Sequence, residues 1–252
     1  NGAELGPLAG APLGASDRAL ASSAADARNW QRRRSKNVKL EATDVTSRVN
    51  RAANVGKSVI FNQLTGSQQI IGNWPGKTVE RAEGLLHFNG YDATIVDLPG
   101  IYSMSTFSLE ELVSREYIAK EKPDVIINVI GAAVLERNLF FTLQLMEMNV
   151  PMIVCLNQMD VAEDHGIAID TGKLERLLGL PVVPTVAAKG KGIPELMATA
   201  IQVAEYNPKP ITNSIKFGEA VEAETGELTR LIESAHLTTE YPPRWLAIKL
   251  LE

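Results

Sequence analysis

Three short apolar runs, separated by stretches of helical periodicity, constrain the fold of this chain most. The runs lie at 124–130, 152–156 and 182–186. Each is rich in β-branched residues, which is typical of strands buried on both faces of a sheet. The stretches with a helical period lie at 109–120, 136–148, 171–178 and 194–204. Strands that alternate with helices predict a mostly parallel sheet covered by helices on both faces, with a ligand crevice at the carboxyl ends of the strands.

Two further features complete the predicted order of elements. Asn89-Gly90 is a strong two-residue turn signal, and it predicts a β-hairpin from the strands 78–88 and 91–96. Beyond residue 206 no strand pattern remains, and the best helices lie at 219–235 and 244–252, divided by Pro242-Pro243. We therefore predict an α/β domain followed by a small all-helical one.

The composition limits what the chain can do. With 252 residues, 45% of them hydrophobic, it can form one α/β domain with a small appendage. A net charge of -5 argues against a general nucleic-acid binder. The single cysteine, Cys155, lies in an apolar run, which predicts a buried thiol and a reducing compartment.

No run approaches the roughly 20 apolar residues of a membrane-spanning helix, so we expect a soluble chain. Residues 1–36, rich in Ala, Gly and Ser, predict a disordered leader, and a first residue other than Met suggests a fragment.

The first chemical motif is Asn-Val-Gly-Lys-Ser at 54–58, where a helix is predicted to begin. Backbone N–H groups at a helix N-terminus bind anions, and Gly56 lets the chain approach phosphates closely. Lys57 would bridge the β- and γ-phosphates, and the Ser58 hydroxyl would bind Mg²⁺. The predicted phosphate-binding residues are Asn54, Val55, Gly56, Lys57, Ser58 and Val59.

The second motif is Asp97-Leu98-Pro99-Gly100, directly after an apolar strand. Asp97 can hold Mg²⁺, and the N–H of Gly100 can meet the γ-phosphate. Between the first two motifs, a predicted loop at 72–78 ends in Thr78. We predict that this threonine joins Mg²⁺ and the γ-phosphate only in the triphosphate state. The predicted Mg²⁺ ligands are thus Ser58, Thr78 and Asp97.

The third motif is Asn157-Gln158-Met159-Asp160, after the strand at 152–156. A carboxylate can accept two N–H bonds from the edge of guanine, which adenine does not offer, so Asp160 is predicted to select guanine. Asn157 would brace the loop and the base. A backbone N–H at Ala187 or Ala188 could reach the guanine oxygen. The order and spacing of the three motifs predict a guanine-nucleotide-binding domain, and they imply GTP hydrolysis.

Longer strings narrow the family. They are Gly-Asn-Trp-Pro-Gly-Lys-Thr-Val-Glu at 72–80, Asp-Leu-Pro-Gly-Ile-Tyr-Ser at 97–103, Leu-Glu-Arg-Asn-Leu at 135–139, and the segment 241–252. With them the chain resembles the cytosolic N-terminal part of the ferrous iron transport protein B family, prokaryotic iron importers of the inner membrane. The resemblance runs from Asn54 to Glu252. It implies a Ras-like P-loop GTPase fold, with a mostly parallel six-stranded sheet and helices on both faces.

The resemblance also implies a domain plan and partners. A G domain would occupy 37–206, and a small helical, GDI-like domain would occupy 207–252, ending before a polytopic membrane domain. Expected partners are GTP or GDP, the membrane domain of the full-length protein, and small accessory proteins of iron transport, with no nucleic acid. The chain would work at the cytoplasmic face of the inner membrane.

A potassium-stimulated mechanism is a further implication of the resemblance. In similar GTPases the residue matching Asn54 helps coordinate K⁺, and carbonyls near Gly72 and Trp74 complete the site. This cation would neutralise transition-state charge, as an arginine finger does elsewhere. Ile101 stands where Ras-like proteins carry a water-orienting glutamine, so slow intrinsic turnover is expected. The residues predicted to act in hydrolysis are Asn54, Lys57, Thr78 and Gly100, with Mg²⁺ and K⁺ as cofactors.

The phosphate loop departs from the expected pattern. Arg51 replaces the first glycine of Gly-x-x-x-x-Gly-Lys-Ser, which makes the tight turn off the first strand. The family pattern puts that strand near 45–50, a stretch too polar for the centre of a parallel sheet. Either the first strand is rebuilt, or this segment is altered. Gly131 is a smaller departure, since an Asp is usual there.

Two other functions stay open. One is a nucleotide-binding or regulatory docking module whose hydrolysis is impaired by the atypical Arg51-Ala52-Ala53. The other is a soluble GTPase of ribosome assembly. Such proteins normally carry a basic RNA-binding domain, which this acidic chain does not show.

Overall fold

A computed structural model describes residues 37–44, 55–66, 69–99, 109–206, 216–235 and 239–252, all within one compact unit. The predicted disordered leader at 1–36 lies outside the described residues.

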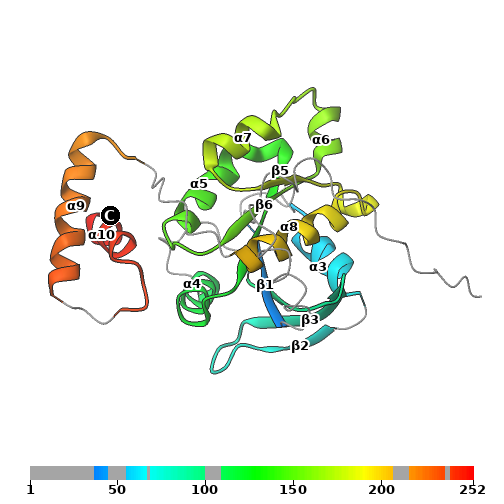
Figure 1. The fold of residues 1–252 in the computed structure, drawn as a ribbon, viewed down its shortest axis with the longest axis horizontal. Coiled ribbons are helices and arrows are strands. Elements are labelled where there is room, and N and C mark those ends of the chain that lie inside the picture. The colour runs from blue at the N-terminus through cyan, green and yellow to red at the C-terminus, as the bar shows by residue number, and fades with distance from the viewer. Residues whose placement is uncertain (1–36, 45–54, 67–68, 100–108, 207–215, 236–238) are drawn as a thin grey trace, which may run out of the picture. The chain divides into compact units, whose positions relative to one another are not determined.

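In these described segments the sheet has seven strands, in the order β2-β3-β4-β1-β5-β6-β7 (Figure 1). Strands β1, β4, β5, β6 and β7 pair in parallel, whereas β2-β3 and β3-β4 are antiparallel. The bounds are β1 Asn37–Asp44, β2 Gln69–Asn73, β3 Glu80–Phe88, β4 Tyr91–Asp97, β5 Val125–Gly131, β6 Met152–Asn157 and β7 Val182–Pro184. The predicted strand-and-hairpin pattern is confirmed, and Asn89 and Gly90 both have positive φ, as the tight turn requires.

The expected number of six strands is wrong by one. Strand β2 adds an antiparallel edge, with Ile71 opposite Ala82 and Gly72 opposite Arg81. Gly72 and Asn73 fall in the predicted loop because Gly, Asn and Pro are turn residues. Two β-branched isoleucines just before them, together with pairing to β3, extend the strand through both residues.

The first strand is rebuilt from residues upstream of the expected place. Strand β1 lies between β4 and β5, and Leu40 pairs with both Ile95 and Val125. The stretch 45–50, where the family pattern puts the strand, is outside the described residues and follows β1. The sequence of β1, Asn-Val-Lys-Leu-Glu-Ala-Thr-Asp, alternates polar and apolar residues rather than forming an apolar run, so its pattern does not identify it as central.

Helices cover both faces of the sheet, as predicted (Figure 1). Side chains from α4, α5 and α7 pack with Ile126, Ile130 and Val154 on one face. Those of α3 and α8 pack with Ile127, Val129 and Cys155 on the other. The bounds are α3 Lys57–Thr65, α4 Leu109–Glu121, α5 Leu135–Met146, α6 Met159–Asp164, α7 Thr171–Leu178, α8 Ile193–Tyr206, α9 Glu219–Ser234 and α10 Pro243–Leu251. The short α6 was not predicted, since six residues are too few for a clear period.

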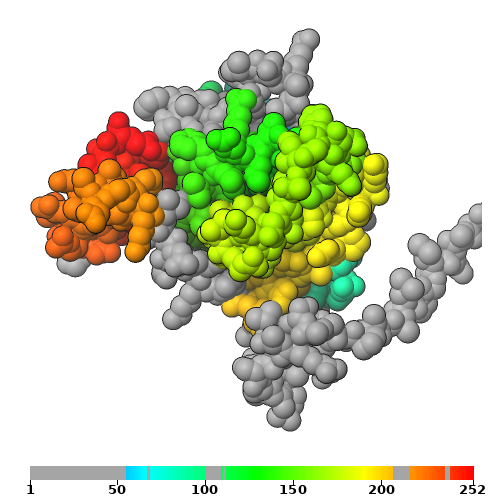
Figure 2. All heavy atoms as spheres, turned by 90° about the horizontal axis from the view of Figure 1, so that it is seen from above, coloured from blue at the N-terminus to red at the C-terminus, as the bar shows by residue number. Residues whose placement is uncertain are grey.

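The two C-terminal helices form a separate pair that touches the α/β part. Pro243 is the first residue of α10, a position where proline costs no hydrogen bond. Trp245 of α10 belongs to the same apolar cluster as α4 and α5, and Figure 2 shows α10 in red beside the green segments. In the described part of the chain, no helix has the length and apolar character needed to cross a bilayer.

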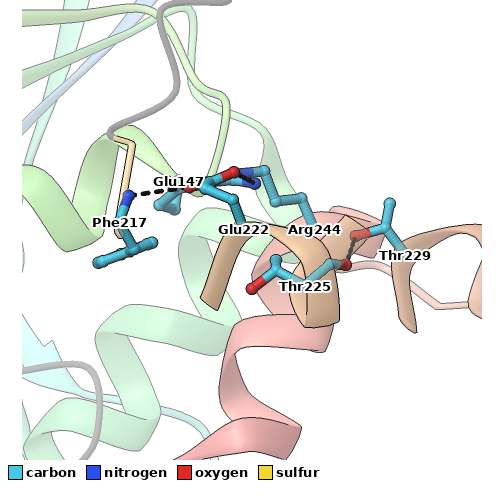
Figure 3. A network of polar contacts seen from close by, with 6 residues as sticks. All are labelled: Glu147, Phe217, Glu222, Thr225, Thr229 and Arg244. Atoms are coloured by element: carbon cyan, nitrogen blue, oxygen red, sulfur yellow. Dashed lines mark hydrogen bonds and ion pairs between the residues drawn. The ribbon is translucent and has the colours of Figure 1, made fainter. Parts of the chain in front are cut away.

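An arginine joins this pair to the α/β part (Figure 3). The Arg244 guanidinium donates two hydrogen bonds to Glu222 of α9, at 3.0 and 3.1 Å. It also donates one to Glu147, directly after α5, at 3.2 Å. The Glu147 side chain is only 8% exposed. Burial raises the pKa of Glu147, and the nearby Arg244 charge opposes that shift.

Candidate nucleotide-binding site

Asn157 joins three segments that are far apart in the sequence. Its side-chain amide donates to the carbonyl of Val55 at 2.8 Å. Its side-chain oxygen accepts from the Thr185 hydroxyl at 3.0 Å and from the Ala187 N–H at 2.9 Å. Since Asn157 is 3% exposed, these are buried hydrogen bonds, which are costly to break. One side chain therefore ties the first motif to the third and to the 187–189 turn.

Gly56 needs to be glycine for two independent reasons. Its φ is +88°, a conformation that other L-residues rarely adopt. A Cβ at this position would also lie 2.4 Å from the side-chain nitrogen of Asn157. Helix α3 begins at the next residue, so its free backbone N–H groups lie here. Val55 is fully buried, whereas Ser58 and Val59 in the first turn are exposed.

Lys57 and Asp97 form an ion pair at the carboxyl end of β4. The Lys57 amine lies 3.1 Å from an Asp97 carboxylate oxygen, and it also donates to the carbonyl of Leu98. Lys57 is 8% exposed. Burial raises the pKa of Asp97, and the charge and hydrogen bond of Lys57 oppose that rise. Asn54 and Gly100, the remaining members of these two motifs, lie outside the described residues.

The predicted guanine loop follows β6. Gln158 has a left-handed backbone, φ 61°, and Asp160 lies in the first turn of α6. Asp160 pairs with Lys189 at 2.8 Å, and the hydrogen bond from Lys189 lowers the pKa of this carboxyl. Ala187 is buried and Ala188 exposed, and both belong to a 3-10 turn, Ala187–Lys189.

Sequence reasoning missed two residues of this neighbourhood. Thr185 bonds to Asn157, and Lys189 bonds to Asp160. Lys189 ends the string Val-Ala-Ala-Lys at 186–189, for which the sequence predicts only backbone contacts to guanine. A positive charge shortly after the end of a strand was the sequence feature that could have indicated this ion pair. Nothing in the sequence indicated a role for Thr185, because Asn157, its hydrogen-bond partner, is 28 positions away.

Gly131, which departs from the usual Asp, has almost no free space. A Cβ there would lie 3.0 Å from Val134 and 3.1 Å from Val55. Its N–H donates to the Asn138 side chain at 2.8 Å. The glycine thus lets the end of β5 pack directly against the residue that precedes Gly56.

The loop with Thr78 is folded back on itself. Trp74 is buried; its carbonyl accepts the N–H of Lys77 at 3.0 Å, and its N–H donates to the carbonyl of Val79 at 2.9 Å. Every second residue of an antiparallel strand faces the same neighbour, so Gly72, two positions before Trp74, also directs its carbonyl toward β3. Thr78 is exposed. Both carbonyls expected to bind K⁺ are therefore turned toward the chain itself in this conformation.

The described residues contain no group of three or more His, Cys, Asp and Glu side chains that could hold a metal ion by themselves.

A mostly parallel sheet with a Gly-Lys-Ser helix start, an Asp turn and an Asn-Gln-Met-Asp loop at its strand ends defines a P-loop GTPase fold of the Ras-like class, followed by a helical pair. The chain belongs to the ferrous iron transport protein B family, whose model matches residues 48–200. A second model, the FeoB cytosolic helical domain, matches residues 217–252.

Individual relatives agree with this assignment. The chain is 43% identical over 202 residues to a Fe(2+) transport protein A/Fe(2+) transporter FeoB fusion protein of Porphyromonas gingivalis, covering 79% of this chain and 24% of that protein. It is 39% identical over 203 residues to Fe(2+) transporter FeoB of Escherichia coli K12, covering 79% and 26%. The chain therefore spans about a quarter of the length of these relatives.

Solved structures match along most of the chain. The cytosolic domain of T. maritima FeoB in a GDP form superposes with a TM-score of 0.77 at 32% identity, covering 86% of this chain and 82% of that one. The cytosolic domain of L. pneumophila FeoB gives 0.74 at 34% identity, covering 84% and 80%.

Proposed function

We propose that this chain is the GTP-binding and GTP-hydrolysing part of a ferrous iron transporter. A G domain at 37–206 would bind the nucleotide, and a helical domain at 207–252 would transmit its state. The observation that carries the proposal is the Asn157 side chain, which holds together the phosphate motif and the guanine loop. Similar cytosolic domains are described in GDP and GMPPNP forms, which supports a nucleotide as the ligand.

The position of each residue suggests which part of the nucleotide it would contact. Residues from Asn54 to Val59 would surround the phosphates at the start of α3. There Lys57 would leave its ion pair with Asp97 and bind phosphate oxygens instead. Asp160 and Gln158 would contact guanine, with Ala187 and Ala188 offering backbone N–H groups. Asn54, Lys57, Thr78 and Gly100 would act in hydrolysis.

Magnesium fits the residues proposed to hold it. Ser58 presents an exposed hydroxyl in the first turn of α3, and the Asp97 carboxylate lies next to Lys57. Oxygen donors of this kind, completed by phosphates and water, are what Mg²⁺ prefers. Bound there, the ion would neutralise phosphate charge. Thr78 would join these ligands after its loop turns inward.

Potassium would bind beside Asn54, with carbonyls from Gly72 and Trp74. Because those carbonyls face the chain itself in this conformation, the loop would have to open before they could serve. We therefore expect K⁺ stimulation to depend on the triphosphate state, and a low intrinsic rate of hydrolysis without it.

Iron import would be the output of the nucleotide cycle. The relatives are named Fe(2+) transporters, and the matched region is about a quarter of their length, so a membrane domain of the full-length protein is the proposed partner. The chain would lie at the cytoplasmic face of the inner membrane. The P. gingivalis relative is fused to Fe(2+) transport protein A, which supports a small accessory protein as a second partner.

A docking module with impaired hydrolysis is the second candidate, and one observation favours it. Strand β1 ends at Asp44 and α3 starts at Lys57, whereas a standard phosphate loop connects strand and helix with a shorter Gly-rich segment. Replacing Arg51 by glycine tests this candidate. A clear gain in GDP affinity would show that Arg51 weakens the phosphate loop, and an unchanged affinity would remove that argument.

The decisive experiment is GTP hydrolysis with Mg²⁺ in KCl and in matched NaCl. We expect a K⁺-dependent rate that is lost in Asn54→Ala. The control Asn149→Gly, remote from the motifs and at a positive φ that glycine accepts, should keep it. GDP binding without turnover in either salt would favour the docking module. Failure to bind either nucleotide would refute both candidates.

A further inference from the structure

A turn closed by its own backbone presents Lys189 to the predicted guanine loop. The N–H of Lys189 donates to the carbonyl of Val186 at 2.9 Å. The backbones of Val186 and Lys191 exchange two further hydrogen bonds, at 3.0 and 3.2 Å. A side chain at Gly192 would clash with the carbonyl oxygen of Pro184, so the chain after the turn packs directly on β7. The backbone that carries the Lys189 side chain is therefore held in place.

Asp160, the residue predicted to select guanine, already has a partner on each carboxylate oxygen. Its Oδ1 atom accepts the N–H of Val161 at 3.1 Å. Its Oδ2 atom lies 2.8 Å from the Lys189 amine. Of these two partners the amine is the one that can leave, because the Lys189 side chain is 69% exposed and ends a flexible four-carbon stem. In this conformation a removable cation thus covers one of the two oxygens that would bind guanine.

The Lys189 amine and the edge of a guanine base compete for the Asp160 carboxylate. The two N–H donors of the base approach side by side, and each needs one carboxylate oxygen. Although Oδ2 keeps a second lone pair, an ammonium at 2.8 Å from it places a full positive charge beside these partly positive N–H groups. That charge weakens the hydrogen bonds from the base. Guanine therefore binds Asp160 better when the ammonium is elsewhere.

Helix α6 offers the ammonium a second position. Glu163 and Asp164 follow Asp160 by three and four residues, a spacing that places side chains on the same face of a helix. Both are exposed. The hydrogen bond and charge of Asp160 raise the pKa of Lys189, and the charges of Asp164 and Glu163 add to that rise. Both carboxylates are therefore within electrostatic reach of Lys189, which can leave Asp160 without losing a negative partner.

We infer that Lys189 is a gate on the guanine-reading carboxylate. Before a nucleotide binds, its ammonium covers Asp160. When guanine binds, the ammonium moves along α6 to Glu163 and Asp164 and leaves both Asp160 oxygens to the base. The apparent affinity for a guanine nucleotide is then lowered by the fraction of molecules in which the gate is closed. This inference rests on the proposed function, because it needs a guanine base at Asp160.

Binding of fluorescently labelled GDP to the full chain, followed by stopped flow and titration, tests the gate. Lys189→Met removes the charge but keeps an apolar stem. It should raise the association rate and the affinity for GDP by about two- to fivefold, the range expected when an exposed ion pair no longer competes. This gain over wild type should vanish in about 1 M salt, because salt screens exposed charges. Lys189→Gln should reproduce the result with a polar side chain.

Inorganic pyrophosphate separates an effect on the base from an effect on the phosphates. It has no base to reach Asp160, so Lys189→Met should leave its affinity unchanged. Lys191→Met is the matched control, because Lys191 is exposed two residues further along and carries the same charge; it should change neither affinity. The double variant Glu163→Gln, Asp164→Asn removes the open position of the gate. It should lower GDP affinity when Lys189 is present and have no effect together with Lys189→Met.

Three outcomes overturn the gate. One is a GDP affinity that stays the same or falls in Lys189→Met while pyrophosphate binding is unchanged, since the lysine would then be neutral or would support Asp160. Another is an equal change for GDP and pyrophosphate, which would mean that the charge acts on the phosphates. The third is a wild-type chain that binds neither GDP nor pyrophosphate, and this result alone refutes the proposed function as well.

Discussion

Replacing Gly56 by alanine should destabilise the nucleotide-free protein through two separable effects. The positive φ of +88° costs an alanine roughly 1–2 kcal/mol. The new Cβ would lie 2.4 Å from the Asn157 side-chain nitrogen, so the hydrogen bond from that nitrogen to Val55 must break or move. Losing a buried hydrogen bond costs roughly another 1–3 kcal/mol. We therefore expect the free energy of unfolding to fall by about 2–5 kcal/mol.

A double-mutant cycle with Asn157→Ala separates the two effects. Without the Asn157 side chain the clash is absent, and Gly56→Ala should then cost only the backbone part, about 1–2 kcal/mol. The measurement is urea unfolding followed by circular dichroism, with no nucleotide present. Gly166→Ala is the matched control, because Gly166 has φ +69° but a Cβ there would meet no atom within 4 Å. Its cost should be the same in both backgrounds.

Additive costs of Gly56→Ala and Asn157→Ala, within about 0.5 kcal/mol, would refute this reasoning. Such a result would mean that the Asn157 amide does not hold the phosphate motif as the structure shows, and that the two residues act independently.

Three further changes test other parts of the molecule. Asp160→Asn should weaken GDP binding by about 100-fold or more, because two charged hydrogen bonds are lost, and should strengthen xanthosine diphosphate binding; unchanged GDP affinity by calorimetry would contradict the guanine role. Burial raises the pKa of Cys155 to about 12 against 9.0 for an ordinary thiol. The unfolded chain therefore releases this proton first, and stability falls as pH rises from 9.0 toward 12. The stability advantage of wild type over Cys155→Ala should shrink by about 1.4 kcal/mol between about pH 8 and pH 10, and a constant advantage in urea titrations would show that the thiol is accessible. Arg244→Ala leaves the buried Glu147 without its partner and should cost roughly 2–4 kcal/mol in the same assay. Adding Glu147→Gln should recover part of this loss, and no recovery would argue against a buried charge as the cause.

The parts of the fold that the sequence predicted well are those with a strong local signal. Apolar runs predicted β5, β6 and β7, and Asn89-Gly90 predicted the β3–β4 turn. Pro242-Pro243 divided α9 from α10. Each of these patterns comes from the residues of the element itself, either from burial of a strand on both faces or from the backbone preferences of Asn, Gly and Pro. They could therefore be recognised without knowing which elements are adjacent in the fold.

The elements that were missed depend on contacts distant in sequence. Strand β1 is polar at every second position, yet it pairs with β4 and β5 through its backbone. Strand β2 ends in residues typical of a turn and is held by β3. Likewise, the Thr185 contact to Asn157 joins the ends of two adjacent strands, and only the parallel register of β6 and β7 brings them together.

The same register explains why one asparagine can hold two motifs together. Strand β6 ends at Asn157, between the β5 end, where Gly131 packs on Val55, and the β7 end, where Ala187 follows. The side chain therefore reaches Val55 of the first motif with its amide nitrogen and the 187–189 turn with its oxygen. Val55, the residue before Gly56, is thus held by a hydrogen bond from Asn157 and by close packing against Gly131. The start of α3 is therefore anchored to the ends of two neighbouring strands, β5 through Gly131 and β6 through Asn157.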